Sequence, residues 1–325
     1  MRDAREFESA RVAICIPTYR RRELLSKLLV SLSDLKFKKV SAPFISVVVV
    51  DNDEEQTARE TCAQLALPWP LKYVVEPRRG IATVRNRAIL EAGPHDFIVM
   101  VDDDEFVTPF WLDELLWTCA TTNSDVVAGP VLPEYSDNVP KWVLAGGFFD
   151  RPAFATGKPM EKCSSNNVLI KRSVFDSVAS FSDMFELTGA EDTEFFLRTR
   201  RAGFNIVWCN EAVVYEDISR NRANADWLLR RAYRLGNSWS FCEKLIDPRP
   251  ATRIVRFVKG LALIAKGVAT GIVSPIGGKA SMMRSLQMIW YGAGQISGLW
   301  GHRYEEYRSA GVDSSKEISE LAPNA

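Results

Sequence analysis

Histidine is scarce in this sequence, and its scarcity limits the chemistry that the chain can perform. The 325 residues include two histidines, His95 and His302. Nucleophilic catalysis by serine or cysteine usually relies on a histidine that takes the proton. With so little imidazole available, we expect carboxylates to carry out any acid–base step.

Paired cysteines, an excess of one charge and an export signal are also lacking. The six cysteines lie far apart and form no CxxC pair, which argues against a zinc site or a disulfide framework and indicates a reducing cytosol. Because the 41 basic and 41 acidic residues balance, we expect no nucleic acid as a partner. The first residues, MRDAREFESARVAICIP, carry charges where a signal peptide has its apolar core, so we expect no export.

Four short apolar runs predict buried β-strands. They cover residues 12–17, 44–50, 71–75 and 97–101, and helical patterns separate them. Strands that alternate with helices predict an α/β fold with a mostly parallel sheet, and ligands bind at the carboxyl ends of such strands. Beyond residue 125 the order becomes mixed, with strand-like DVVAGPVLP and SSNNVLIKR and the helix-like GAEDTEFFLRTRRAG.

Four consecutive acids follow the fourth run, in FIVMVDDDEFV. Crowded carboxylates repel one another, so Asp102, Asp103, Asp104 and Glu105 require a cation, hydrogen-bond donors or water. Carboxylate oxygens without imidazole or thiolate suit a hard cation such as Mg²⁺ or Mn²⁺. The alternative is a solvated acidic turn in front of the next helix.

Five stretches in order resemble the motifs of one enzyme family. They are VAICIPTYRRRELLSKLLVSL, VVVVDND, RRGIATVRNRAI, VMVDDDE and GAEDTEFFLRTRRAG, and the match runs from about residue 12 to 245. The chain resembles the inverting glycosyltransferases of family 2, and more narrowly their bacterial exopolysaccharide members such as succinoglycan-type glucosyltransferases. The resemblance implies the GT-A nucleotide-sugar fold, a Rossmann-like, mostly parallel sheet flanked by helices.

The resemblance also implies roles for residues of these motifs. In the family pattern, Asp104 ligates Mg²⁺ or Mn²⁺ and Asp102 contacts the ribose or the metal. Asp103, between them, is expected to face elsewhere, because successive residues leaving a strand point to opposite sides. Asp192 is implied as the catalytic base. The nucleotide-binding residues would be Thr18, Tyr19, Arg20, Asp51, Arg85 and Asp102.

Some of these residues have simpler explanations, and one position departs from the family. Asp51 could be a turn residue, Arg85 a surface charge, and Asp192 with Glu191 a favourable charge pair at a helix start. Where many relatives place a metal-binding histidine, this chain offers Glu216 or Asp217. Residues near the acceptor or diphosphate would be Asn166, Asn167, Glu191, Arg220, Arg222 and Arg231, with an ordinary turn or a solvated helix face as the alternative.

The stretch 246–303 differs from the rest because it is both basic and apolar. It holds eight Lys or Arg and one acid, Asp247. Residues 254–276 are long enough to cross a bilayer, but Arg256, Lys259 and Lys266 each oppose a central position by roughly 2.5–3.5 kcal/mol. We therefore expect a helix that lies in an anionic membrane surface, with a second one over 282–300. A helical subdomain packed on the core is the alternative.

Together these features predict an enzyme with three segments. We expect a glycosyltransferase domain over 8–245, a helical membrane-associating segment over 246–310 and a flexible tail over 311–325. The expected reaction moves glucose from a UDP-sugar to a lipid-linked glycan at the cytoplasmic face of the inner membrane. The alternatives are a nucleotide- or carbohydrate-binding membrane scaffold and a sugar nucleotidyltransferase. The latter is disfavoured because IPTYRRR stands where a glycine-rich phosphate loop with lysine would be.

Overall fold

The computed structural model describes residues 7–186 and 188–305, and its contacts group them into two compact units. The sheet unit comprises residues 7–139, 147–182 and 192–220, and the helical unit comprises the remaining described residues. The tail predicted over 311–325 lies outside the described residues.

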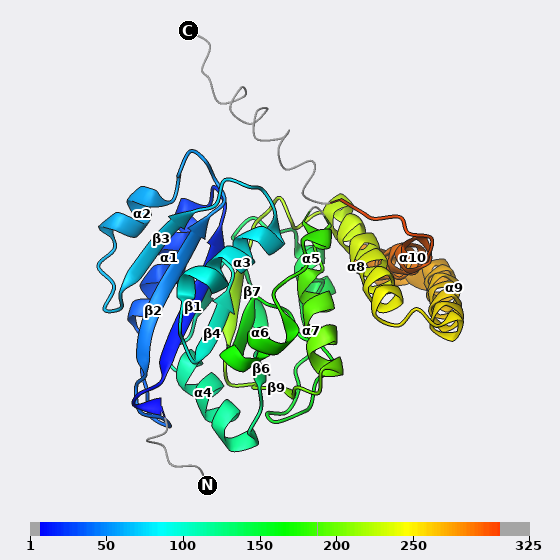
Figure 1. The fold of residues 1–325 in the computed structure, drawn as a ribbon. Coiled ribbons are helices and arrows are strands. Elements are labelled where there is room, and N and C mark those ends of the chain that lie inside the picture. The colour runs from blue at the N-terminus through cyan, green and yellow to red at the C-terminus, as the bar shows by residue number, and fades with distance from the viewer. Residues whose placement is uncertain (1–6, 187, 306–325) are drawn as a thin grey trace. The chain divides into compact units, whose positions relative to one another are not determined.

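A seven-stranded sheet forms the centre of the sheet unit (Figure 1). Its order is β3-β2-β1-β4-β8-β6-β9, with parallel pairing from β3 to β4 and antiparallel pairing of β8 with both of its neighbours. The strands are β1 Arg11–Thr18, β2 Phe44–Asp51, β3 Leu71–Val75, β4 Phe97–Val101, β6 Val126–Ala128, β8 Asn167–Lys171 and β9 Ile206–Trp208. The four predicted strands are confirmed.

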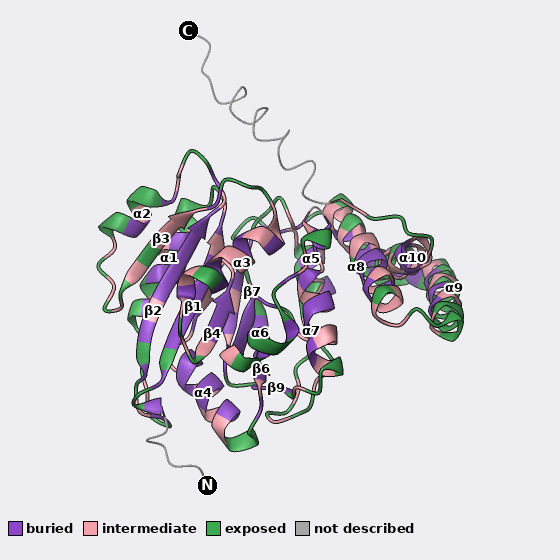
Figure 2. Cartoon of the chain, in the orientation of Figure 1, coloured by how far each residue is buried: buried purple, intermediate pink, exposed green. Residues whose placement is uncertain are grey.

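Helices cover both faces of this sheet, which explains the continuous apolar runs. Val12, Ile14 and Ile16 of β1 pack in one core layer, and Ala13 and Cys15 pack in the other. The helices α1 (Arg22–Ser33) and α4 (Trp111–Thr122) supply the first layer. The second layer is supplied by α3 (Ile81–Ala92), α6 (Arg172–Val178) and α7 (Glu191–Arg201). Figure 2 shows the resulting buried strands.

The stretch DVVAGPVLP forms two strands instead of one. β6 ends at Ala128 and β7 (Val131–Tyr135) begins after Gly129 and Pro130. β7 belongs to a second sheet of order β5-β10-β7, with β5 at Glu105–Val107 and β10 at Val214–Ile218. The glycine is required here, because a Cβ at position 129 would lie 2.3 Å from the carbonyl oxygen of Ala212.

Residues 54–66, EEQTARETCAQLA, form one of the helical patterns between the predicted strands, but the observed helix is shorter. The observed α2 covers Arg59–Gln64. Before it, Asp51 and Asp53 accept backbone hydrogen bonds from Ala58 and Glu55, and Gln56 adopts a left-handed φ of 57°. These bonds hold the preceding residues in a turn.

The helical unit consists mainly of three long helices. They are α8 (Ala225–Ile246), α9 (Pro250–Val273) and α10 (Gly278–Leu299), joined after α9 by the 3₁₀ turn η3 (Ser274–Gly277). Two short elements, α5 (Lys141–Gly146) and η2 (Asp183–Phe185), belong to the same unit. The contacts thus group α8 with α9 and α10, although the sequence placed its residues in the glycosyltransferase domain. The boundary at residue 245 stays a prediction.

Candidate active site

The candidate site lies at the carboxyl ends of β1, β2 and β4, where the parallel part of the sheet ends (Figure 1). Thr18 ends β1, Asp51 ends β2, and the four acids follow β4 directly. Parallel pairing places these strand ends side by side, so residues far apart in the sequence meet at one edge.

Asp102 and Asp103 bond to different partners. The Asp102 carboxylate accepts a hydrogen bond of 2.9 Å from Nη2 of Arg85, which α3 holds in a buried position. Asp103 accepts bonds from Thr18 Oγ1 at 2.8 Å, Tyr19 N at 3.4 Å and Arg21 Nη1 at 3.0 Å. Burial raises the pKa of the Asp103 carboxyl, and these donors oppose the shift. Asp103 therefore connects the acid run 102–105 to the end of β1.

Asp104 and Asp103 both bond to the guanidinium group of Arg21. Asp104 Oδ2 accepts a bond of 3.0 Å from the same Arg21 Nη1, and its carbonyl oxygen accepts one of 2.9 Å from Asp217 N in β10. The motifs that mark the other candidate residues did not point to Arg21. The available signal was its position in the run Tyr19-Arg20-Arg21-Arg22, directly after the first strand. Arg21 offsets part of the negative charge that the acid run brings together.

Glu105 is the most deeply buried of the four acids, at 1% exposure. Its Oε2 accepts a bond of 2.9 Å from Asp102 N, and its Oε1 accepts one of 2.7 Å from Asn166 Nδ2. Burial, followed by the charges of Asp102 and Asp104, raises the pKa of Glu105 well above its usual range. Asp102 N and Asn166 Nδ2 are the donors that this buried carboxyl meets within the described residues.

Glu216, and not Asp217, faces this cluster. β10 pairs with β5 so that Glu216 lies opposite Glu105. The Glu216 carboxylate accepts a bond of 2.8 Å from Arg151 Nη2, and Arg151 Nη1 lies 3.4 Å from Asn166 Oδ1. Asp217 has its carboxylate 3.7 Å from Lys27 Nζ. Of the two residues that could replace the family's histidine, Glu216 is the one that lies opposite the acid run, and a metal-binding role for either stays a prediction.

Two arginine side chains lie against the aromatic ring of Tyr19. The guanidinium carbons of Arg20 and Arg79 lie 5.4 Å and 5.1 Å from the ring centre, and Arg79 Nη2 also donates to the Tyr19 hydroxyl. Arg20 forms two bonds to Asp53, at 3.1 Å and 3.2 Å. Burial raises the pKa of Asp53, but the bonds from Arg20 and Thr57 outweigh it and hold that pKa below its usual value. An aromatic face with adjacent cations suits a base and a diphosphate.

Asp51 and Asn167 are bonded within the scaffold. Asp51 is fully buried and accepts from Asp53 N at 3.0 Å, Ala58 N at 3.0 Å and the Tyr73 hydroxyl at 2.7 Å. Asn167 accepts from Trp111 Nε1 at 2.8 Å and donates to the carbonyl oxygens of Pro130 and Ala212 at 2.9 Å and 2.8 Å. Both residues shape the strand ends, and their roles toward nucleotide and acceptor stay predictions.

The implied base lies on a separate element. Asp192 is the second residue of α7, and within the described residues its carboxylate accepts hydrogen bonds from Thr193 alone. Burial, followed by the Asp192 charge, raises the pKa of the nearby Cys163 thiol well above its usual value. No described hydrogen bond joins Asp192 to the acid run. Its catalytic role stays a prediction.

The other residues expected near the acceptor divide between the units. Asn166 belongs to the acid cluster, and Arg220 ends the last segment of the sheet unit. Glu191, Arg222 and Arg231 belong to the helical unit. There, the guanidinium carbons of Arg222 and Arg231 lie 5.2 Å and 5.4 Å from the ring centre of Trp227. These candidate acceptor residues therefore belong to two different units.

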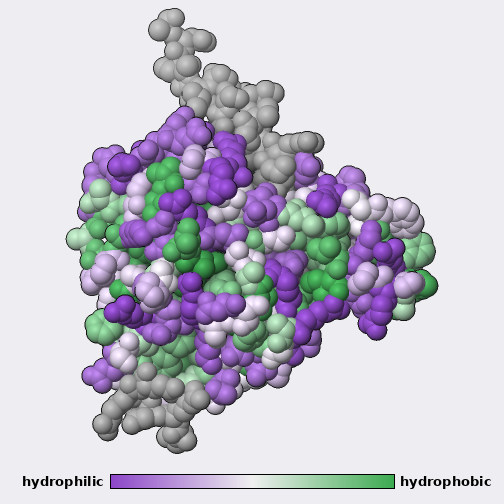
Figure 3. Space-filling model, viewed as in Figure 1, coloured by the Kyte–Doolittle hydropathy of each residue, from purple (hydrophilic) through white to green (hydrophobic). Residues whose placement is uncertain are grey.

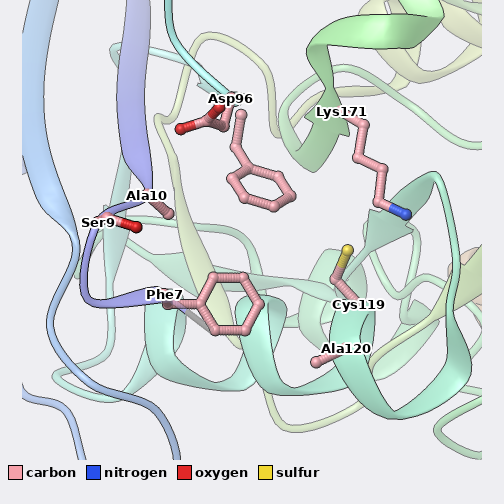
Figure 4. A pocket seen from close by; sticks show the side chains of 8 residues that line it. Phe7, Ser9, Ala10, Asp96, Cys119, Ala120 and Lys171 are labelled. Atoms are coloured by element: carbon pink, nitrogen blue, oxygen red, sulfur yellow. The ribbon is translucent and has the colours of Figure 1, made fainter. Parts of the chain in front are cut away.

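A cavity of about 340 Å³ lies elsewhere in the sheet unit, at the amino ends of β1 and β4 (Figure 4). Its lining is mixed, with Phe7, Phe97 and Cys119 beside Asp96 and Lys171. Ligands of parallel sheets bind at the opposite edge. We therefore take the carboxyl edge as the candidate site.

Comparison with protein families decides the identity of the fold. The model of Glycosyl transferase family 2 matches residues 13–179, more than half of the chain, and that of Glycosyl transferase family group 2 matches residues 97–300. The chain belongs to glycosyltransferase family 2. The enzyme class predicted from the motifs is confirmed at this level.

Curated relatives connect this glycosyltransferase with exopolysaccharide biosynthesis. It is 33% identical to the succinoglycan biosynthesis protein ExoM of Rhizobium meliloti (strain 1021), over 95% of this chain and 99% of that protein. It is 25% identical to the glucosyl-dolichyl phosphate glucuronosyltransferase of Haloferax volcanii, over 78% and 83%. The chain is thus a family 2 glycosyltransferase related to exopolysaccharide biosynthesis enzymes.

Solved structures confirm the fold. The mannosyltransferase PcManGT of Pyrobaculum calidifontis, in complex with GDP-Man and Mn²⁺, aligns with a TM-score of 0.60, at 18% identity over 91% of this chain and 88% of its own. Residues 1–349 of TarS from S. aureus align with a TM-score of 0.53, at 16% identity over 91% and 93%. The GT-A-like, parallel-rich α/β fold expected from the sequence is confirmed.

Proposed function

We propose that this protein is a metal-dependent, inverting glycosyltransferase that moves glucose from a UDP-sugar to a lipid-linked glycan. The observation that carries the proposal is the meeting of the acid run 102–104 with Arg85 and the Thr18–Arg21 segment at one sheet edge. In a family 2 chain, this arrangement suits a nucleotide diphosphate held by cations on both sides.

The ligand chemistry of the acid run suits a divalent cation, although among the described residues its carboxylate oxygens do not meet as a group of three within 4.8 Å of one another. Asp102, Asp104 and Glu216 offer carboxylate oxygens, which are the ligands that Mg²⁺ and Mn²⁺ prefer. Support comes from PcManGT, a protein of similar fold whose complex holds Mn²⁺. Such an ion, when bound, would neutralise charge on the departing diphosphate. In the described arrangement, Arg21 donates a hydrogen bond to the Asp104 carboxylate. When a metal ion binds Asp104, this bond would have to break or be shared with the ion.

The nucleotide would lie beside Tyr19. Its ring, with Arg20 and Arg79 within about cation–π distance, offers a stacking face for the base and positive charge for the phosphates. Arg85 would hold Asp102 and contact the diphosphate. Asp51 would hold the loop 52–58, whose backbone it bonds, in place beside the nucleotide. The family pattern also implies a direct contact of Asp51 with the base.

We propose Asp192 as the base of a single displacement. Its carboxylate would take the proton of the acceptor hydroxyl while that oxygen attacks the anomeric carbon. A new carbon–oxygen bond forms as the bond from the anomeric carbon to the diphosphate breaks, and the nucleoside diphosphate leaves with the electron pair. Attack from the face opposite the leaving group inverts the anomeric configuration, so one base suffices.

A lipid-linked acceptor and a peripheral position at the cytoplasmic face of the inner membrane complete the proposal. One relative supports the lipid-linked acceptor by its name, the glucosyl-dolichyl phosphate glucuronosyltransferase of Haloferax volcanii. Among the described residues, the segment Pro250–Leu299 is long and apolar enough to cross a membrane, by length and composition. Residues 248–304 contain no acid, which suits an anionic surface.

A donor screen tests this function. Purified full-length protein is incubated with UDP- and GDP-sugars, Mn²⁺ and a membrane extract, and the released nucleotide is measured. We expect UDP release that depends on both the extract and the metal. Tight UDP binding without any release would favour the scaffold alternative, and pyrophosphate formed from a nucleoside triphosphate and a sugar phosphate would favour the nucleotidyltransferase.

A further inference from the structure

The helical unit is held together by close helix contacts at glycines. A Cβ on Gly236 of α8 would lie 2.1 Å from the carbonyl oxygen of Tyr291 in α10. On α9, a Cβ at Gly267 would lie 2.7 Å from the Ser285 carbonyl oxygen, also in α10. α10 therefore packs closely against both other helices, and α9 uses one narrow side for this contact.

The opposite side of α9 is apolar along the whole helix. Successive residues turn by about 100°, so positions far from the Gly260 and Gly267 contacts share an outer face. That face carries Ile254, Val258, Leu261, Val268 and Ile272, which are 63%, 56%, 47%, 52% and 77% exposed, together with alanines between them. Figure 2 colours much of α9 as exposed, and Figure 3 shows hydrophobic surface at this helix.

Charge lies beside the outer face and not on it. Lys259 and Lys266 share one flank of α9 and are exposed, whereas Arg256 is buried and bonds to Glu243 of α8 at 2.6 Å. After α9, the η3 turn adds Ile276, which is 92% exposed, and residues 267–278 contain no charge. The outer face and this turn form one surface, which we call the α9 face.

We propose that the α9 face lies flat in the interface of an anionic membrane, with Lys259 and Lys266 directed toward the headgroups. Between Ile254 and Ile272 the apolar stripe extends over about 27 Å at 1.5 Å per residue. Such a stripe with lysines on its flank matches an interfacial helix. This inference rests on the proposed peripheral location but not on the proposed chemistry.

Two other occupants match the surface less well. A second copy of the chain would bring the same cationic flank, and residues 248–304 offer no acid to pair with it. A bilayer crossing would bury Lys259 and Lys266 near the middle of a helix, where each costs roughly 2.5–3.5 kcal/mol. Lysines at an interface instead extend to the headgroups. The helix 282–300, expected from sequence as a second interfacial helix, instead serves α8 and α9 as a packing partner through its glycines.

The test compares flotation of purified full-length variants with vesicles of phosphatidylcholine, with and without phosphatidylglycerol. Val258→Glu/Ile272→Glu places two acids on the α9 face. Val30→Glu/Leu90→Glu is the matched control, because it changes two exposed apolar residues, at 49% and 71%, on helices of the sheet unit. Circular dichroism confirms that each variant is folded.

We expect wild type and the control to float with anionic vesicles, and the α9-face variant to bind at least about tenfold more weakly, since each buried aliphatic side chain contributes that much or more. Lys259→Gln/Lys266→Gln should retain binding but lose about fivefold of the preference for anionic vesicles per lysine. Flotation of the α9-face variant like wild type would overturn the proposal.

Two further outcomes would also overturn it, and they identify the cause. If wild type binds no vesicles and the α9-face variant dissociates a dimer seen by light scattering, a second copy covers the face. If alkaline carbonate fails to release the protein from cell membranes, the segment spans the bilayer. Turnover of UDP-sugar with a soluble acceptor is measured separately, so loss of the proposed chemistry would not be mistaken for loss of membrane binding.

Discussion

The two units of this protein place charge and apolar surface in opposite ways. The sheet unit buries Asp51, Asp103 and Glu105 at one edge, each with hydrogen-bond donors around it. The helical unit buries glycines, Ser285 and Gln295 and leaves large apolar side chains at the surface. Among the described residues, four exposed large hydrophobics belong to the sheet unit and fifteen to the helical unit.

This difference separates chemistry from location. Crowded carboxylates that neighbouring guanidinium groups offset are suited to bind a cation and a diphosphate. Exposed apolar side chains on a helix without acids are suited to a lipid surface. Variants of the sheet unit should therefore change donor binding and turnover, and variants of the helical unit should change membrane binding. Each prediction below would weaken this separation if its opposite were observed.

The largest effect is expected for Asp104→Ala. If Asp104 ligates the cation, its loss removes charge stabilisation of the leaving diphosphate, which is worth several kcal/mol. Turnover should fall by roughly 10³-fold or more, and UDP binding should no longer respond to Mn²⁺. Calorimetry with and without EDTA measures the second effect.

A matched control for Asp104→Ala is Asp137→Ala, an exposed acid in the same unit. It removes the same charge and should leave metal-dependent UDP affinity unchanged. Vesicle flotation should be normal for both variants. Metal-dependent UDP affinity that is equal in Asp104→Ala and wild type would exclude Asp104 as a ligand.

Asp192→Asn should have the next largest effect. Asparagine keeps the size and most hydrogen bonding of the side chain but cannot take a proton, so transfer should fall by roughly 10²–10⁴-fold while donor affinity changes little. If Asp192 only stabilises the start of α7, the substitution would lower the free energy of unfolding by a fraction of a kcal/mol and leave transfer nearly intact, because asparagine also suits that position. Turnover, UDP-sugar affinity and melting temperature measured on one preparation separate these cases; near-normal turnover would falsify the base assignment.

The scaffold of the sheet unit could be predicted from sequence because burial on both faces leaves a strong local signal. Residues 12–17, 44–50, 71–75 and 97–101 form strands that the structure bounds within one residue. The ends of those strands gave the site its candidates. Side-chain pairing at these ends was not predictable, since it depends on contacts between distant segments. Arg21 bonding two acids more than eighty positions away is one example.

The helical unit was harder to predict for a different physical reason. Its composition indicated apolar, basic helices over 246–303 and favoured an interfacial position over a bilayer crossing, with a packed subdomain as the alternative. The decision depends on which side of each helix the neighbours cover, and glycines set that side here. A glycine in a helix carries no hydrophobic signal, so the contact of Gly294 in α10 with the Tyr233 carbonyl of α8 leaves no periodic pattern.

Gly294→Ala should loosen the helical unit while leaving the sheet unit unchanged. Its Cβ would lie 2.1 Å from the carbonyl oxygen of Tyr233, a backbone atom that cannot turn away. Overpacking costs about 1–3 kcal/mol, so amide exchange in α8 and α10 should accelerate by roughly 5- to 150-fold. Hydrogen exchange mass spectrometry resolves the two units.

Gly271→Ala is the control for this prediction. Its Cβ would lie 3.9 Å from the nearest atom, Ser285 Cβ, which is an ordinary contact. Because alanine favours helices over glycine by about 0.5–1 kcal/mol, exchange should slow slightly or stay the same. Equal acceleration in both variants, or faster exchange in β1 and β4 of Gly294→Ala, would contradict the packing described here.

The smallest effect is expected for Arg21→Gln, which examines how the acid run is balanced before a ligand binds. Arg21 Nη1 lies 3.0 Å from oxygens of both Asp103 and Asp104, and its side chain is 48% exposed. A cation at Asp104 must compete with this pairing. Exposed ion pairs contribute about 0.2–1 kcal/mol, so Mn²⁺ should bind the variant up to about fivefold more tightly when no nucleotide is present.

Arg22→Gln, which removes the same charge from the neighbouring exposed residue, should leave Mn²⁺ affinity near that of wild type. Calorimetric titration of Mn²⁺ into each protein measures the difference. Weaker Mn²⁺ binding in Arg21→Gln would mean that Arg21 organises Asp104 for the metal, and equal tightening in Arg22→Gln would mean that net charge alone, and not the pairing with Asp103 and Asp104, controls the affinity.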